Sequence, residues 1–178
     1  MKKSVFTYIL VLVLTALVLA GLTFGLRSTA QANKQSVQLR MMQALLPGSE
    51  SFTEEAYTGE DTTIRSVHKG NDGFVIEVAA QGYADEITML VGVRSNGKVT
   101  GLVVADMHET AGLGSAALTD WEFLAQFLNT SGDATIGDGV DGLSGATVTS
   151  KAVARCVNSA VAYVTGSDVE SGATSWGG

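Results

Sequence analysis

Hydroxyl side chains gather where the sequence DGLSGATVTS, residues 141–150, runs into a segment with helical spacing. They belong to Ser144, Thr147, Thr149 and Ser150. Gly145 among them permits a backbone conformation that a side chain would oppose. Because a helix N-terminus offers unpaired N–H groups and the positive end of a dipole, it binds anions. The segment therefore predicts a phosphate-binding turn; the alternative is a plain helix cap with an Asx-type turn at Asp141.

A second polar segment, DMHETAGLGS at residues 106–115, follows a predicted strand. His108, Glu109 and Thr110 place polar groups just beyond the strand end, and two glycines after them mark a bend. Loops held at strand ends often carry binding residues. The segment is a candidate for a ligand site, and the alternative is a solvated loop.

The sequence lacks the motifs of several other sites. No G-x-S-x-G elbow is present, and no Gly-Lys-Ser/Thr follows a glycine pair at phosphate-loop spacing. The acidic residues Asp133, Asp138 and Asp141 lack calcium-loop spacing. The single cysteine, Cys156, excludes an internal disulfide and is expected to be a buried small apolar side chain. Two histidines are too few for a convincing metal site.

The overall charge disfavours nucleic acid as a partner. The formal net charge is −7 at pH 7, and no cluster of Lys and Arg interrupts it. Non-specific nucleic-acid binding needs a basic surface that displaces counterions. We therefore expect no nucleic-acid partner.

Sequence periodicity predicts an α+β fold, with an antiparallel sheet packed by helices. Strands at 87–94 and 98–105 flank Asn96-Gly97, a strong hairpin signal, and alternation predicts another strand at 74–79. Residues 49–71 are interpreted as mostly loop, with one short strand at 63–67.

Three helices are expected around this sheet. One runs from 31 to 46 and stops before Pro47. A second is capped by Thr119-Asp120 and runs through Asn129, with Trp121 expected in the core. A Gly/Asp loop at 130–141 leads to the third helix, which is predicted to end at Tyr163.

The N-terminal residues 5–26 carry no charge and are long enough to cross a hydrocarbon core of ~30 Å as a helix. A retained anchor is favoured over a cleaved signal peptide, because the apolar run exceeds the usual signal-peptide length. Lys2 and Lys3 favour a cytoplasmic N-terminus, with the soluble body on the extracytoplasmic side. The expected parts are a tip and transmembrane anchor at 1–27, a juxtamembrane helix at 28–48, one domain at 49–165 and a flexible polar tail at 166–178.

Three features in this order resemble the FMN-binding domain family of the membrane subunits RnfG and NqrC. They are the N-terminal anchor, HETAGLG at 108–114, and DGLSGATVTS at 141–150 running into a helix. The chain length is more similar to RnfG, the shorter of the two. One departure is that Glu109 follows His108 directly and Ala111 stands where family loops often have proline.

The resemblance implies a covalent flavin. In the family, a separate flavin transferase uses FAD to esterify FMN through its phosphate to the threonine that closes D-x-x-S-G-A-T, which is Thr147 here. The resemblance also implies the remaining cofactor-binding residues: Ser144, Gly145, Ala146 and Thr149 at the turn, and His108, Glu109, Thr110, Leu113 and Gly114 in the loop. Residues 168–174 repeat the motif and end at Thr174, but no helix follows them, so Thr147 is the expected site.

The function implied by the resemblance is electron transport without independent turnover. The resemblance implies a single-pass inner-membrane subunit of an Rnf-type complex, with other membrane subunits as partners. Such a complex moves electrons between ferredoxin and NAD, and this transfer is coupled to ion transport. Two alternatives remain open. One is an extracytoplasmic FMN carrier for a different membrane reductase, and the other is a module that binds a phosphate ligand non-covalently.

Overall fold

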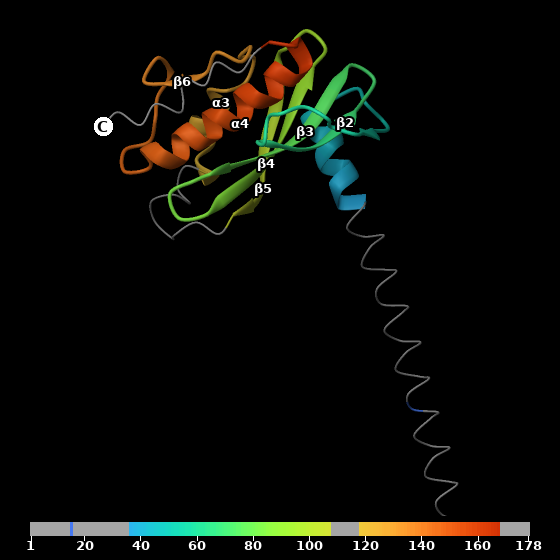
Figure 1. The fold of residues 1–178 in the computed structure, drawn as a ribbon, viewed down its shortest axis with the longest axis horizontal. Coiled ribbons are helices and arrows are strands. Elements are labelled where there is room, and N and C mark those ends of the chain that lie inside the picture. Colours follow the sequence, from blue (N-terminus) through green and yellow to red (C-terminus); the bar gives the residue numbers. More distant parts are fainter. Residues whose placement is uncertain (1–14, 16–35, 108–117, 168–178) are drawn as a thin grey trace, which may run out of the picture. The chain divides into compact units, whose positions relative to one another are not determined.

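The computed structural model describes residues 15, 36–107 and 118–167 (Figure 1). The chain divides into two units, Met1–Arg40 and Met41–Gly178, and the fold below is that of the second. The predicted anchor apart from Thr15, the loop residues His108–Gly114 and the second motif with Thr174 lie outside the described residues. Within the described ranges, no helix is long and apolar enough to cross a membrane.

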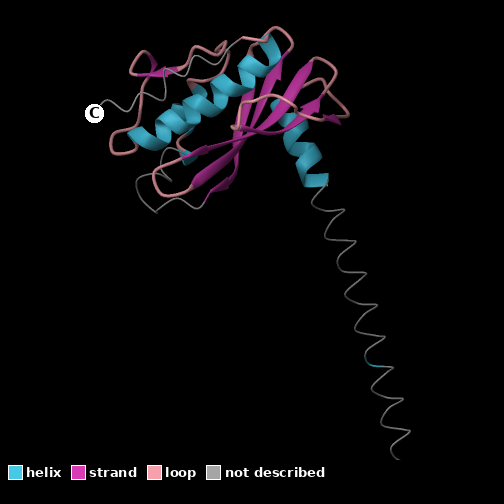
Figure 2. Ribbon diagram, in the orientation of Figure 1, coloured by secondary structure: helices cyan, strands magenta, loops and turns pink. Residues whose placement is uncertain are grey.

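A five-stranded antiparallel sheet, with its strands in sequence order, forms the centre of the fold (Figure 2). Its strands are β1 (Thr53–Glu55), β2 (Ile64–Lys69), β3 (Gly73–Gln81), β4 (Glu86–Arg94) and β5 (Val99–Met107). The predicted α+β class, an antiparallel sheet packed by helices, is confirmed. Strand β1 lies in a region that we interpreted as mostly loop. Its sequence, TEE, carries no apolar alternation, so the strand leaves no signal in the sequence.

The turn between β4 and β5 is the hairpin that Asn96-Gly97 predicts. Gly97 has a φ of 80°, in the left-handed region that glycine adopts without strain. The Arg94 N–H donates to the Lys98 carbonyl at 2.9 Å, and the Gly97 N–H donates to the Arg94 carbonyl at 2.8 Å. Beyond the turn Val93 pairs with Val99, and an irregularity after Val93 shifts the register so that Gly92 of β4 lies opposite Gly101 of β5.

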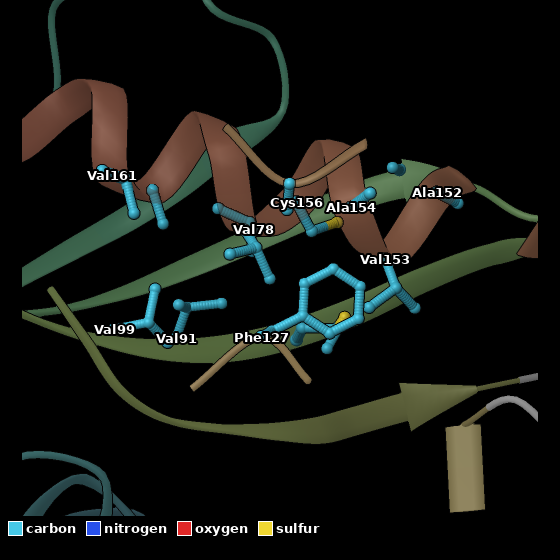
Figure 3. Packing of buried hydrophobic residues seen from close by; sticks show 14 of the residues in the cluster. Val78, Val91, Val99, Phe127, Ala152, Val153, Ala154, Cys156 and Val161 are labelled. Atoms are coloured by element: carbon cyan, nitrogen blue, oxygen red, sulfur yellow. The ribbon is translucent and has the colours of Figure 1, made fainter. Parts of the chain in front are cut away.

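Helix α4 (Thr147–Thr165) packs on β3 and β4 and buries the main core (Figure 3). Alternation places Ile87, Met89 and Val91 of β4 on the face toward this helix, and all three are buried. From the helix, Val153 and Val157 are fully buried against them. The helix ends at Thr165, two residues beyond the predicted end, where Gly166 takes the left-handed cap conformation with a φ of 67°.

The opposite face of the sheet receives the end of helix 36–45, which stops before Pro47 as expected. Leu45 and Leu46 pack there in a small cluster with Val75 and Leu90. A Cβ added at Gly92 would lie 2.3 Å from the Leu45 carbonyl oxygen, so glycine permits this close approach. The Thr100 hydroxyl donates to the same oxygen at 2.5 Å.

The segment between β5 and α4 differs from the sequence prediction. Helix α3 covers only Trp121–Ala125. Its N-cap is Asp120, as predicted, because the carboxylate accepts from the Phe123 N–H at 3.0 Å. A turn with i to i+3 hydrogen bonds replaces the rest of the predicted helix, and Asn129 adopts a positive φ of 65°. The placement of Trp121 in the core was wrong, since its side chain is 70% exposed.

The predicted Gly/Asp loop contains two short parallel strands, β6 (Thr135–Ile136) and β7 (Gly139–Val140). Asn158 of α4 holds this segment, because its amide donates to the Ala134 carbonyl at 2.9 Å and accepts from the Ala134 N–H at 3.2 Å. Strands of two residues leave too little periodicity to be predicted.

The Cys156 thiol is expected to be inert in the folded protein. It is fully buried among the core residues of α4, and burial raises the pKa of Cys156 to about 12, so the reactive thiolate is scarce at neutral pH. Labelling with iodoacetamide at pH 8 should be slow in buffer and fast in denaturing urea. Rapid labelling of the native protein would contradict this burial.

Candidate functional site

The predicted phosphate-binding turn is a tight bend that leads directly into α4. The Ala146 N–H donates to the Leu143 carbonyl at 3.0 Å. Gly145, inside this bend, has a φ of 79°, which a side chain would oppose. Each residue of the sequence GAT therefore has a structural role: Gly145 makes the turn, the buried Ala146 packs against the core, and Thr147 begins the helix.

The helix begins without a side-chain cap, although hydroxyls surround it. Its N-cap residue is Ala146, and no side chain accepts a hydrogen bond there. Ser150 instead ties the bend to the helix: its hydroxyl donates to the Ala146 carbonyl at 2.9 Å and accepts from the Leu143 N–H at 3.3 Å. Among the residues that the structure describes, the first N–H groups of α4 therefore have no side-chain acceptor, which leaves them available to an anion.

The threonines of the first turn face opposite environments. Thr147 is exposed, whereas Thr149 is fully buried. The Thr149 hydroxyl has no hydrogen-bond partner among the described residues, and an unsatisfied buried hydroxyl costs about 1–3 kcal/mol. The Thr147 hydroxyl, at the start of the helix, is therefore the one of the two that a ligand can reach.

A pocket of about 180 Å³ adjoins this turn. The first turn of α4 and the bend before it form one wall, with Gly145, Thr147 and Thr149 among the lining residues. Tyr83, from the turn between β3 and β4, forms the rest of the lining. Ser144 and Gly145 are exposed beside it.

Sequence reasoning missed Tyr83. Its side chain is 67% exposed, and its position in a short polar turn, GYAD at 82–85, was the only signal of a surface aromatic. The loop residues predicted to line the site, His108, Glu109, Thr110, Leu113 and Gly114, lie outside the described part of the chain.

The chain before the bend is anchored to the segment after α3. The Asp141 N–H donates to Gln126 Oε1 at 2.8 Å, and Gln126 Nε2 donates to the Asp141 carbonyl at 3.3 Å. A Cβ at Gly142 would lie 2.6 Å from the Ile136 side chain, so this glycine allows close packing. The Asp141–Thr147 segment is therefore held at both ends.

A larger pocket, of about 590 Å³, contains none of the predicted site residues. It lies between residues 57–62 and the second half of α4, and its lining includes Asp61, Arg155 and Ser159. Asp61 Oδ2 and the Ser159 hydroxyl are buried and do not reach hydrogen-bonding geometry. Asp61 Oδ1 accepts from the Thr63 N–H at 2.8 Å, so this carboxylate mainly holds the chain that enters β2.

Replacing Asp61 by asparagine should make stability less dependent on pH. Burial opposes ionisation of the carboxyl, but hydrogen bonding by Thr63, the adjacent Ser159 hydroxyl and the charge of Arg155 together hold the pKa of Asp61 below 3.8. A lowered carboxyl pKa stabilises the fold above the ordinary pKa, and this stabilisation is lost as pH falls through the folded-state value. The difference between the urea midpoints of the wild type and Asp61→Asn should therefore be largest near neutral pH and should begin to narrow only as pH falls below about 4. A difference that stays constant down to pH 2 would contradict this role.

Comparison with known proteins shows the family of the chain. The FMN-binding domain family matches residues 82–162, a range that begins at the turn carrying Tyr83 and includes most of α4. The chain is 30% identical to the G subunit of the proton-translocating ferredoxin:NAD(+) oxidoreductase complex of Clostridium ljungdahlii, over 83% of each chain. It is 31% identical to the G subunit of the ion-translocating oxidoreductase complex of Methanosarcina acetivorans, over 92% of this chain and 96% of that one.

A third relative, the G subunit of the ion-translocating oxidoreductase complex of Pseudoalteromonas atlantica, is 31% identical over 92% of this chain and 89% of that one. The crystal structure of Shewanella oneidensis NqrC aligns at 23% identity and a TM-score of 0.44, over 66% of this chain and 65% of that one. The chain belongs to the family formed by the G subunits of ion-translocating oxidoreductase complexes, and it contains an FMN-binding domain. The family resemblance predicted from the sequence is confirmed.

Proposed function

We propose that this chain is an electron-carrying subunit of an Rnf-type complex and holds FMN covalently through a phosphoester to Thr147. The observation that carries the proposal is the exposed hydroxyl of Thr147 at the start of an uncapped helix, beside a pocket. Membership of the G-subunit family and the match to the FMN-binding domain support both the cofactor and the electron-transfer role.

The residues of the turn fit a phosphoryl group. The N–H groups at the start of α4 can donate to phosphoryl oxygens, and the helix dipole stabilises an anion there by about 0.3–1 kcal/mol. Gly145 leaves room for the backbone to approach the group closely.

Attachment requires an external flavin transferase, since nothing near Thr147 in the described structure activates its hydroxyl. The Thr147 Oγ1 attacks the phosphorus of the FMN half of FAD and loses its proton. A new O–P bond forms, the bond between the two phosphates of FAD breaks, and AMP leaves. FMN, once bound, supplies one- and two-electron redox chemistry, while the protein supplies attachment and orientation.

The proposal also includes the location and the partners. The uncharged run at 5–26 supports a single membrane-spanning anchor in the inner membrane, with the FMN-binding domain on the extracytoplasmic side. A covalent link suits that side, because a dissociated flavin would be lost from the cell. The partners are the other membrane subunits of the complex, which in the named relatives translocates ions.

The test is purification of the full chain in detergent from native membranes, followed by denaturation in SDS. Flavin fluorescence should remain on the protein band, and the other membrane subunits should be present before denaturation. Release of all flavin by SDS would overturn the covalent link and favour a module that binds a phosphate ligand non-covalently. Retained flavin with a different reductase as the co-purifying partner would instead place the chain in another electron-transfer system.

A further inference from the structure

Tyr83 presents a large aromatic surface beside the proposed attachment site. Its side chain is 67% exposed, and it lines the same pocket as Thr147. Because Tyr83 and Thr147 border the same space, a group attached to the Thr147 hydroxyl can reach the ring of Tyr83.

The backbone around Tyr83 is well fixed. The Gly82 N–H donates to the Asp85 carbonyl at 2.9 Å, and the Asp85 carboxylate accepts from the Glu86 N–H at 2.8 Å. Just outside the turn, Gln81 of β3 pairs with Glu86 of β4. These bonds fix the backbone that carries Tyr83 next to β3 and β4, the two strands on which α4 packs.

We propose that the ring of Tyr83 packs against the isoalloxazine ring of the flavin carried on Thr147 and positions it. The inference rests on the proposed function and adds a residue that neither sequence motif contains. The phosphoryl end of the flavin is held at the helix start, and its ring is the aromatic surface that can lie within reach of Tyr83. Aromatic rings pack favourably in offset or edge-to-face arrangements.

Flavin fluorescence distinguishes this contact from a merely nearby side chain. A phenol in contact with an excited flavin donates an electron to it and takes the electron back without light emission, so fluorescence is quenched with no net reaction. Phenylalanine has a similar shape but is not oxidised in this way. Tyr83→Phe therefore separates the quenching contact from the packing contact.

The experiment uses the full chain produced with a flavin transferase, as the wild type, Tyr83→Phe, Tyr83→Ala and Trp121→Ala. Trp121 is the matched control, because it is 70% exposed and does not line the pocket. Flavin fluorescence and its anisotropy are measured in the native state. The intensity is then divided by that of the same sample in SDS, which corrects for covalent flavin content.

Both Tyr83 variants should raise the normalised fluorescence severalfold. Tyr83→Phe should keep the wild-type anisotropy, whereas Tyr83→Ala should lower it because the flavin ring then moves more freely. Trp121→Ala should match the wild type. Unchanged fluorescence in both Tyr83 variants, with normal covalent flavin, would overturn the inference and leave the proposed function standing. Absence of covalent flavin from the wild type would overturn both.

Discussion

Replacement of Thr147 by alanine is expected to abolish covalent flavinylation of the chain while leaving the fold intact. The substitution removes the oxygen that forms the phosphoester. The other hydroxyls of the turn are not equivalent, because Thr149 is buried, the Ser150 hydroxyl is engaged with the backbone, and the exposed Ser144 lies before the bend rather than at the start of the helix. The side chain of Thr147 is exposed, and alanine is a better helix former than threonine, so no loss of stability is expected. Flavin fluorescence of the SDS-denatured band measures the result.

Two control variants make this test specific. Thr147→Ser keeps a hydroxyl at the same position and should retain at least part of the covalent flavin. Thr174→Ala removes the hydroxyl of the second D-x-x-S-G-A-T sequence and should leave the amount of flavin unchanged. Full labelling of Thr147→Ala, or loss of labelling in Thr174→Ala, would move the attachment site away from α4.

Truncation of Phe127 to alanine is expected to destabilise the domain by about 3–5 kcal/mol. Its side chain is fully buried under α4, as Figure 3 shows, and it meets Phe123 edge to face with ring centroids 5.3 Å apart. The cavity left behind would lie among residues of β4 and α4 that already pack closely. The difference in free energy of unfolding, from urea titration of the wild type and the variant, measures the effect.

Trp121→Ala is the matched control for Phe127→Ala, since it also truncates a large aromatic side chain of the same segment. Because Trp121 is 70% exposed, its loss should change the free energy of unfolding by less than about 0.5 kcal/mol. Comparable destabilisation by the two substitutions would contradict the burial described for Phe127.

The sequence predicts the elements that have a strong local signal. The hairpin at Asn96-Gly97, the three strands that alternate around it and the helix that begins at Thr147 all follow from periodicity and turn chemistry. The end of the helix at 36–45 follows from Pro47. In each case local backbone preference and the burial pattern favour the same structure.

In the elements that the sequence did not predict correctly, local backbone preference and burial pattern do not favour the same structure. Strand β1 is short and polar, and it exists because Thr53–Glu55 pairs with the neighbouring strand β2. The second half of the predicted helix after Asp120 becomes a turn in which Phe127 still reaches the core. Trp121 was expected in the core because aromatic residues usually are, but the position of α3 on the surface leaves it exposed.

Only the part of the candidate site that is contiguous in sequence could be predicted. Its helix start, from Ser144 to Thr149, is contiguous in sequence and carries a motif. Tyr83 comes from a turn more than sixty residues earlier, and only the packing of α4 on β3 and β4 brings it to the same pocket. A contact that depends on tertiary packing leaves no spacing rule in the sequence.

The most direct test of the central claim is mass spectrometry of peptides from the full chain, purified from membranes of a host that contains the flavin transferase. We expect the peptide containing Thr147 to be heavier by one FMN less one water, and fragmentation to place this mass on Thr147. An unmodified Thr147 peptide, with or without the flavin mass on Thr174, would contradict it.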